Sequence, residues 1–219
     1  MTTVITKNVS RFNIIYMLLA LLGLYAFAMI VIKDTPQYKV AIESELDFVL
    51  DKMPEAEAKH LESVTQSRFQ RWFYDSGAFY KLKSMFMPKD VQYQEEMSKG
   101  IFSVKRVHQV LNNLQYLVYQ FIMRITLVEF WLYTMLPMMV AMVATGYFNW
   151  KKKAYQLGGQ SVNVVRLWLK VGWGFLLLMS TYLVIPNIAG AYTLFAPPLL
   201  MFIMALAISK IIQSFHKSF

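Results

Sequence analysis

The stretch VKRVHQVLNNLQYLVYQFIMRITLVEFWLYTMLPMMVAMVATGYFNW, residues 104–150, decides the fold. In its first part, apolar residues recur at alternating intervals of three and four, at Val104, Val107, Leu111, Leu114, Val118, Phe121 and Ile125. This spacing is typical of one apolar face of an α-helix. The remainder, 126–150, is long and apolar enough to cross a membrane. We therefore predict one long helix that emerges from the membrane and packs along this apolar seam.

The sequence allows two packing partners for the seam. The partner is either the earlier helices of the same chain or another subunit, which includes a second copy of this chain. In both cases we expect Leu111 and Leu114 to be buried, and the intervening Asn112 and Asn113 to be exposed.

The composition fits a small polytopic membrane protein. The chain has 219 residues, of which 57% are hydrophobic and 16% aromatic, and it carries a net charge of +9. It contains no cysteine. That excludes a disulfide scaffold, thiol catalysis and zinc or iron–sulfur sites with cysteine ligands.

Four segments are predicted to be transmembrane helices: 14–32, 126–150, 167–185 and 188–209. Two interpretations of the first segment are open. Lys7 and Arg11 precede an apolar run in which Ala26-Phe27-Ala28 resembles a signal-peptide cleavage site. The apolar run continues to Ile32, however, which favours a retained anchor.

Charge is divided unequally between the segments that connect these spans. With a cytosolic N-terminus, nine basic residues and no acidic residue lie inside: Lys7, Arg11, Lys151, Lys152, Lys153, Arg166, Lys170, Lys210 and Lys217. The other 13 basic residues lie between Lys33 and Arg124, and all 13 acidic residues lie between Asp34 and Glu129. This is the positive-inside pattern of a multi-pass membrane protein. It predicts a cytosolic N-terminus over 1–13, a basic cytosolic loop over 151–166 and a cytosolic tail over 210–219.

The region 33–125 is then an external domain, which we expect to be helical. Residues 41–53 place Ile42, Leu46, Val49, Leu50 and Met53 at helical spacing, and Pro54 follows them. Residues 67–86 place six large apolar side chains on roughly one side: Phe69, Trp72, Phe73, Phe79, Leu82 and Phe86. This second stretch either lies on the outer membrane surface or packs on neighbouring helices. The fold class is therefore all-α, a polytopic helical membrane protein with four transmembrane helices and a helical external domain.

Residue patterns that carry chemistry are missing. The sequence has no phosphate-binding loop, nucleophile elbow, dinucleotide fingerprint or histidine-rich ligand cluster, and its three histidines are far apart. We expect no enzymatic activity, no cofactor and no metal site. Pro137 and Pro197-Pro198 interrupt predicted spans, either as packing kinks or as the broken helices of a small transporter or channel.

The stretch TGYFNWKKKAYQLGGQSVNVVRLWLK, residues 145–170, resembles a membrane-protein family of integrating conjugative elements and conjugative plasmids. The matching residues are Gly146, Lys151 to Lys153, Gly159 and Ser161, and the order of one span, an external domain and three further spans is similar too. The resemblance implies a component of a conjugative type IV secretion system in the bacterial inner membrane, and hence that the external domain is periplasmic. Such TraJ-type membrane proteins are encoded beside the coupling ATPase and are thought to associate with it. A VirD4-type ATPase and other membrane subunits of the apparatus are the partners implied.

The loop after the second span is our candidate partner-binding site. Its residues are Lys151, Lys152, Lys153, Gly158, Gly159 and Ser161, and the two glycines make the chain easy to bend. We hypothesise that this loop docks the ATPase, whereas the simpler interpretation is a topology signal alone. Anionic lipid headgroups explain the lysines with fewer assumptions than direct contact with nucleic acid does.

Overall fold

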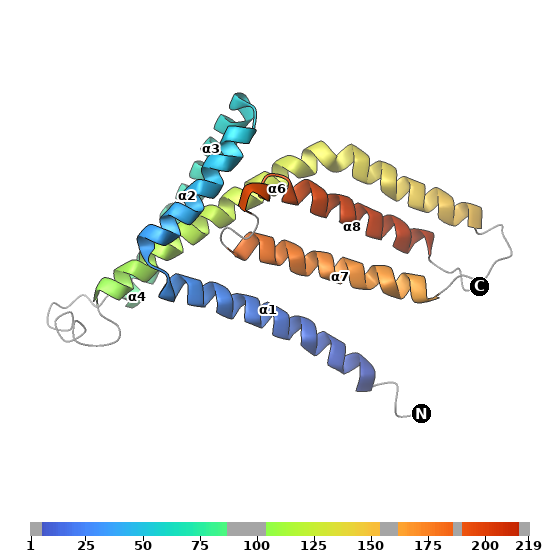
Figure 1. Ribbon diagram of the computed structural model, residues 1–219, viewed down its shortest axis with the longest axis horizontal. Helices are drawn as coiled ribbons and strands as arrows, with labels where there is room; N and C mark the ends of the chain where they lie inside the picture. Colours follow the sequence, from blue (N-terminus) through green and yellow to red (C-terminus); the bar gives the residue numbers. More distant parts are fainter. Residues whose placement is uncertain (1–5, 87–103, 154–161, 186–189, 215–219) are drawn as a thin grey trace. The chain divides into compact units, whose positions relative to one another are not determined.

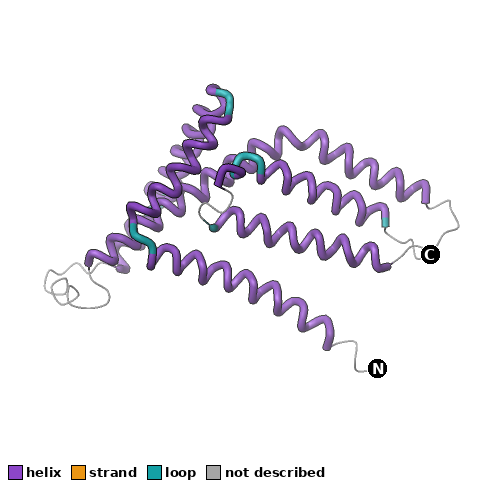
Figure 2. The backbone as a smooth tube through the Cα atoms, viewed as in Figure 1, coloured by secondary structure: helices purple, strands orange, loops and turns teal. Residues whose placement is uncertain are grey.

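The computed structural model describes residues 6–86, 104–153, 162–185 and 190–214, and within these ranges every regular element is a helix (Figure 2). In chain order the elements are α1 (Thr6–Ile32), α2 (Thr35–Lys52), α3 (Glu55–Phe69), the π-helix η1 (Gln70–Asp75), α4 (Ala78–Phe86), α6 (Val104–Lys153), α7 (Val162–Val184), the 3₁₀ helix η2 (Gly190–Tyr192) and α8 (Ala196–Gln213). The prediction of an all-helical fold is confirmed for the described part of the chain.

These helices form two compact units. The first unit contains the described residues 6–86, 104–124 and 184–185, and the second contains 125–153, 162–183 and 190–214. Helix α6 contributes to both, since it continues for 50 residues without a break and passes through Pro137. The predicted single helix that joins the seam to the second span is therefore confirmed.

In the first unit, the chain turns sharply where α1 ends. The axes of α1 and α2 differ by 120° across the break at Lys33 and Asp34. Helix α2 then pairs with α3, and Pro54 stands at the N-cap of α3, where its missing N–H group costs no helical hydrogen bond (Figure 1). Ile42, Val49 and Met53 of the predicted α2 face are buried.

The aromatic stretch 67–86, predicted to place six large apolar side chains on roughly one side, is divided between α3, η1 and α4, and of these side chains Phe73 is buried while Trp72 is exposed. Helix α3 ends at Phe69, η1 follows, and Gly77 adopts a positive φ of 73° before α4 begins. A left-handed backbone is accessible to glycine at little cost, so the helical rise is interrupted there. The rings pack on one another, with 5.4 Å between the centroids of Phe69 and Phe73. Phe69 also contacts Tyr119 of α6, which favours packing on neighbouring helices over a membrane-surface role for this ring.

In the second unit, the later part of α6, α7 and α8 run side by side (Figure 1). Their core contains Phe175, Tyr182 and Leu200, with Val128 and Met204 packed against it. Pro197 and Pro198 lie in the first turn of α8, which begins at Ala196. The prediction that this pair interrupts a helix running from 188 is therefore wrong, because proline is favoured in the first turn, where its missing N–H has no helical partner to lose.

Three helices, α6, α7 and α8, are each long and apolar enough to cross a membrane, and α1 with the bent α2 supplies a fourth candidate. Their outer surfaces carry large exposed apolar side chains, among them Phe27, Leu136, Leu176 and Leu199. An apolar surface of this kind is expected of helices that face lipid.

Candidate functional site

A buried ion pair lies at the centre of the first unit. The guanidinium of Arg124 donates from Nε and Nη2 to the two carboxylate oxygens of Glu45, with both distances 2.7 Å. Both side chains are fully shielded from solvent. A two-pronged contact of this geometry is the strongest that an arginine makes with a carboxylate, so it fixes α2 against α6.

Other polar groups complete this buried charge network, which we define as Glu45, Gln120 and Arg124. The Gln120 amide donates to Glu45 Oε2 at 2.7 Å. Arg124 Nη1 donates to the backbone carbonyl of Ile185, the residue after α7, at 2.8 Å. A buried charge is tolerated only when its partners are in place, so the network links α2, α6 and the chain after α7 in one arrangement.

Tyr38 lies close to this network and is itself buried. Among the described residues its hydroxyl has no hydrogen-bond partner. Burial raises the pKa of the Tyr38 phenol well above its usual value, although the nearby positive charge of Arg124 acts in the opposite direction. The phenol therefore stays neutral.

Sequence reasoning missed the buried charge network, although a signal was present. Glu45 lies three residues after Ile42 and four before Val49, on the buried face of α2. Gln120 and Arg124 are four residues apart, which places both on one face of α6. Burying an unpaired charge is unfavourable, whether it is a carboxylate on the buried face of α2 or a guanidinium just before a span. The presence of one such charge therefore indicates that an opposite charge lies against it.

A second polar contact holds the end of α1. Asn113 Nδ2 donates to the carbonyls of Ile30 and Lys33 at 2.9 and 2.8 Å, and Gln109 Nε2 donates to the Lys33 carbonyl at 2.9 Å. The last carbonyls of a helix have no partner within the helix, and these side chains supply donors. Asn113 is consequently buried, so the prediction that it is exposed is wrong, while Asn112 is exposed as expected.

The predicted packing seam is covered unevenly. Val107 and Leu111 are buried, and Phe121 is exposed. Three members, Leu114, Val118 and Ile125, are half-buried, and the Val104 side chain lies outside what the structure describes. Several of the most deeply buried side chains in this part of α6, Asn113, Gln120 and Arg124, belong to a different side of the helix from the seam.

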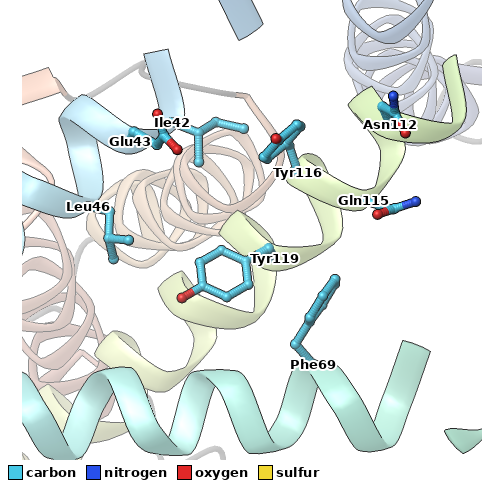
Figure 3. Close-up of a pocket in the computed structure, with 8 residues that line it drawn as sticks. All are labelled: Ile42, Glu43, Leu46, Phe69, Asn112, Gln115, Tyr116 and Tyr119. Atoms are coloured by element: carbon cyan, nitrogen blue, oxygen red, sulfur yellow. The ribbon is translucent and has the colours of Figure 1, made fainter. Parts of the chain in front are cut away.

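An open groove of about 450 Å³ lies between α2, the end of α3 and α6 (Figure 3). Aliphatic and aromatic side chains line most of it, with one carboxylate and two amides: Ile42, Leu46, Phe69, Tyr116, Tyr119, Glu43, Asn112 and Gln115. Glu43 forms a half-exposed ion pair with Lys39 at 3.4 Å. Exposed pairs of this kind contribute little stability, so the groove is principally an apolar surface within the first unit.

The predicted partner-binding residues lie at the end of α6 and beyond it. Lys151 and Lys152 are exposed on the last turn of α6. The helix ends at Lys153, whose side chain is not described, and Gly158, Gly159 and Ser161 lie outside the described residues.

Gly146, by contrast, has a packing role that the sequence did not reveal. A Cβ placed on it would lie 2.5 Å from the backbone oxygen of Ser209 and 2.8 Å from the Ser209 Cα. Helices α6 and α8 therefore approach one another so closely that only glycine fits.

Within the described ranges, no group of three or more histidine, aspartate or glutamate side chains is arranged to hold a metal ion. The described residues thus present three features: helix ends held by amide and guanidinium donors, an apolar groove, and a basic helix end.

Comparison with known proteins gives one match. A family model described as IncC plasmid conjugative DNA transfer protein DtrJ-like matches residues 41–219, from α2 through the last helix. No curated protein and no solved structure matches the chain.

Proposed function

Because the chain belongs to the DtrJ-like family of IncC plasmid conjugative DNA transfer proteins and so acts in conjugation, we propose that it is an inner-membrane adaptor of the transfer apparatus. In this proposal the chain performs no catalysis. Its four apolar segments cross the bilayer, and its basic cytosolic loop holds the coupling ATPase at the membrane. The family match supports the conjugative context predicted from residues 145–170.

The observation that carries the membrane part of the proposal is the coincidence of apolar helix surfaces with one-sided charge. Helices α6, α7 and α8 expose large apolar side chains along their length. Basic residues follow or precede them at one end, where Lys151, Arg166 and Lys210 are exposed. A water-exposed apolar surface of this extent is unfavourable, whereas lipid tails satisfy it and the positive-inside rule orients it.

Reporter fusions test the orientation. A fusion after Phe219 is expected to report a cytosolic position, and an insertion at Gly77 is expected to report an external one. Gly77 is suitable because its positive φ marks a turn and no atom crowds it. A cytosolic signal at Gly77 would contradict the proposed topology.

The adaptor part is tested by exchanging the position of the lysines. Replacing Lys151, Lys152 and Lys153 by glutamine, while adding three lysines beside Lys7, retains the charge on the cytosolic side and hence the orientation. We expect this exchange variant to lose co-purification of the coupling ATPase from detergent extracts and to lower DNA transfer.

A matched control replaces three lysines of the first unit, Lys59, Lys81 and Lys83, which are exposed. This control is expected to keep both ATPase association and transfer. Undiminished association in the exchange variant would show that the lysines fix topology only, and the adaptor hypothesis for this loop would be wrong.

A further inference from the structure

Helix α6 ends, α7 begins and α8 ends at one end of the second unit (Figure 1), and five basic residues lie near these helix termini. We call this surface the basic end and define it by Lys151, Lys152, Arg166, Lys170 and Lys210. All five are exposed, and none forms an ion pair with another described residue. Their positive charge is therefore available to an external anion.

Within the second unit, acidic groups are remote from this surface. Glu129 is the only acidic residue in the sequence of the second unit. It precedes Lys151 by 22 residues on α6, which corresponds to about 33 Å along a helix. No acidic group of the second unit therefore compensates the positive charge of the basic end.

Packing divides the basic residues into two groups. The contact of Gly146 with Ser209 draws α6 and α8 together directly beside Lys210. Lys151 and Lys152 follow Gly146 by five and six residues, which is about 8 to 9 Å along the helix axis, so Lys151, Lys152 and Lys210 form one group at the end of this helix pair. Arg166 and Lys170 are four residues apart and share one face of α7, which makes the second group.

The surface next to the basic end is apolar and aromatic. Tyr147 packs its ring on Phe148 and on Trp150, with 5.8 Å between each pair of centroids. Aromatic rings of this kind are enriched where a span meets the headgroup region. Exposed Leu167 and Trp173 of α7 extend the apolar surface away from the charges.

We propose that the basic end is a binding site for a phospholipid that carries two phosphate groups, of the cardiolipin type. Two groups of cations match two phosphates, and the adjoining apolar surface matches the acyl chains. Nucleic acid would use the cations but leave the apolar surface unsatisfied. This site rests on the proposed membrane insertion, and it deepens that proposal by naming the lipid class.

Native mass spectrometry of the full-length protein in detergent tests the proposal. Cardiolipin, phosphatidylglycerol and phosphatidylcholine are each added at equal phosphate concentration, and the bound fraction is measured. We expect retention in the order cardiolipin, phosphatidylglycerol, phosphatidylcholine, with the cardiolipin signal decreasing as salt is raised.

Substitutions then locate the site. Each charge near a membrane surface is worth about fivefold in affinity, so Arg166→Gln with Lys170→Gln is expected to weaken cardiolipin retention roughly 25-fold. Arg166→Lys with Lys170→Arg keeps both charges and is expected to retain the lipid, which also guards against a glutamine variant that folds poorly. The control Lys59→Gln with Lys81→Gln, in the first unit, is expected to have no effect.

Equal retention of the three lipids, or unchanged retention in the glutamine variant, would overturn the proposal. Tight binding of a single-stranded DNA oligonucleotide that the same variant abolishes, without a change in cardiolipin retention, would assign the surface to nucleic acid instead. Failure of the adaptor proposal is recognised separately. In that case the protein retains cardiolipin, fractionates with membranes and yet does not co-purify with the ATPase.

Discussion

Replacing Arg124 by leucine is expected to destabilise the first unit far more than a typical substitution does. The change leaves the Glu45 carboxylate fully buried without its guanidinium counter-ion, still hydrogen-bonded by the Gln120 amide, and it removes the donor to the Ile185 carbonyl. Breaking a buried ion pair by removing one partner costs about 3 to 5 kcal/mol. Since each 1.4 kcal/mol is a factor of ten, the open state of the unit should become about two to three and a half powers of ten more populated.

The absence of cysteine provides the assay. A single Ala58→Cys substitution places a thiol at a buried position of α3, and the chain contains no other cysteine. The thiol reacts only when the unit opens, so the labelling rate of the native protein reports the opening equilibrium. The purified full-length protein in mild detergent, with and without Arg124→Leu, gives the ratio directly.

The double variant Glu45→Leu, Arg124→Leu decides whether the ion pair is responsible. With the carboxylate gone as well, no buried charge is left unpaired, and the remaining cost is that of the unpaired Gln120 amide and Ile185 carbonyl, about 1 to 3 kcal/mol each. We expect the double variant to be less destabilised than the sum of the two single variants by about 2 kcal/mol or more. Additive costs, or an Arg124→Leu effect below about 1 kcal/mol, would refute the assignment of a coupled buried pair.

Three further substitutions test separate contacts. Asn113→Leu removes donors from the carbonyls at the end of α1 and should cost about 1 to 3 kcal/mol, measured as faster labelling of a thiol introduced at buried Ala26. Gly146→Ala should lower the thermal stability of the second unit in detergent, because its Cβ would clash with the α8 backbone, whereas Gly174→Ala, with nothing within 4 Å, should leave it unchanged or raise it slightly. Leu111→Ala should cost about 2 to 5 kcal/mol if it truncates a packed core side chain, and unchanged resistance to limited proteolysis would contradict its burial.

The long helix and the apolar helices α7 and α8 were predictable because all depend on local patterns. Apolar residues at intervals of three and four, followed directly by an uninterrupted apolar segment, predict one continuous helix, and this helix is α6. Helix α2 likewise follows from its apolar spacing, and Pro54 marks the start of the next helix. In each case the determining residues are neighbours in the sequence.

Contacts between distant residues were not predictable in the same way. In the sequence, Asn113 is a polar residue beside an apolar seam. It is buried because it donates a hydrogen bond to the Lys33 carbonyl at the end of α1, 80 residues earlier. In the sequence, Gly146 is one small residue in an apolar helix, and nothing nearby shows that the Ser209 backbone packs directly against it. Glu45 and Arg124 are 79 residues apart, and the sequence gives no register between α2 and α6 that would pair them.

The polar side chains of α6 nevertheless follow a rule that reaches beyond this pairing. Gln109, Asn113, Gln120 and Arg124 occupy one side of the helix at intervals of four, seven and four, and each uses a nitrogen donor. Three of the four, Gln109, Asn113 and Arg124, donate to the backbone carbonyl of Lys33 or Ile185, just where α1 or α7 has ended. Carbonyls at the end of a helix lack partners, and leaving them unpaired near a bilayer costs several kcal/mol. The polarity of a stripe of amide and guanidinium side chains before a span suggests a surface that faces water. On α6 this stripe is buried instead. It indicates a helix that supplies hydrogen-bond donors to the ends of its neighbours, which is why the most polar side of α6 is also its most deeply buried.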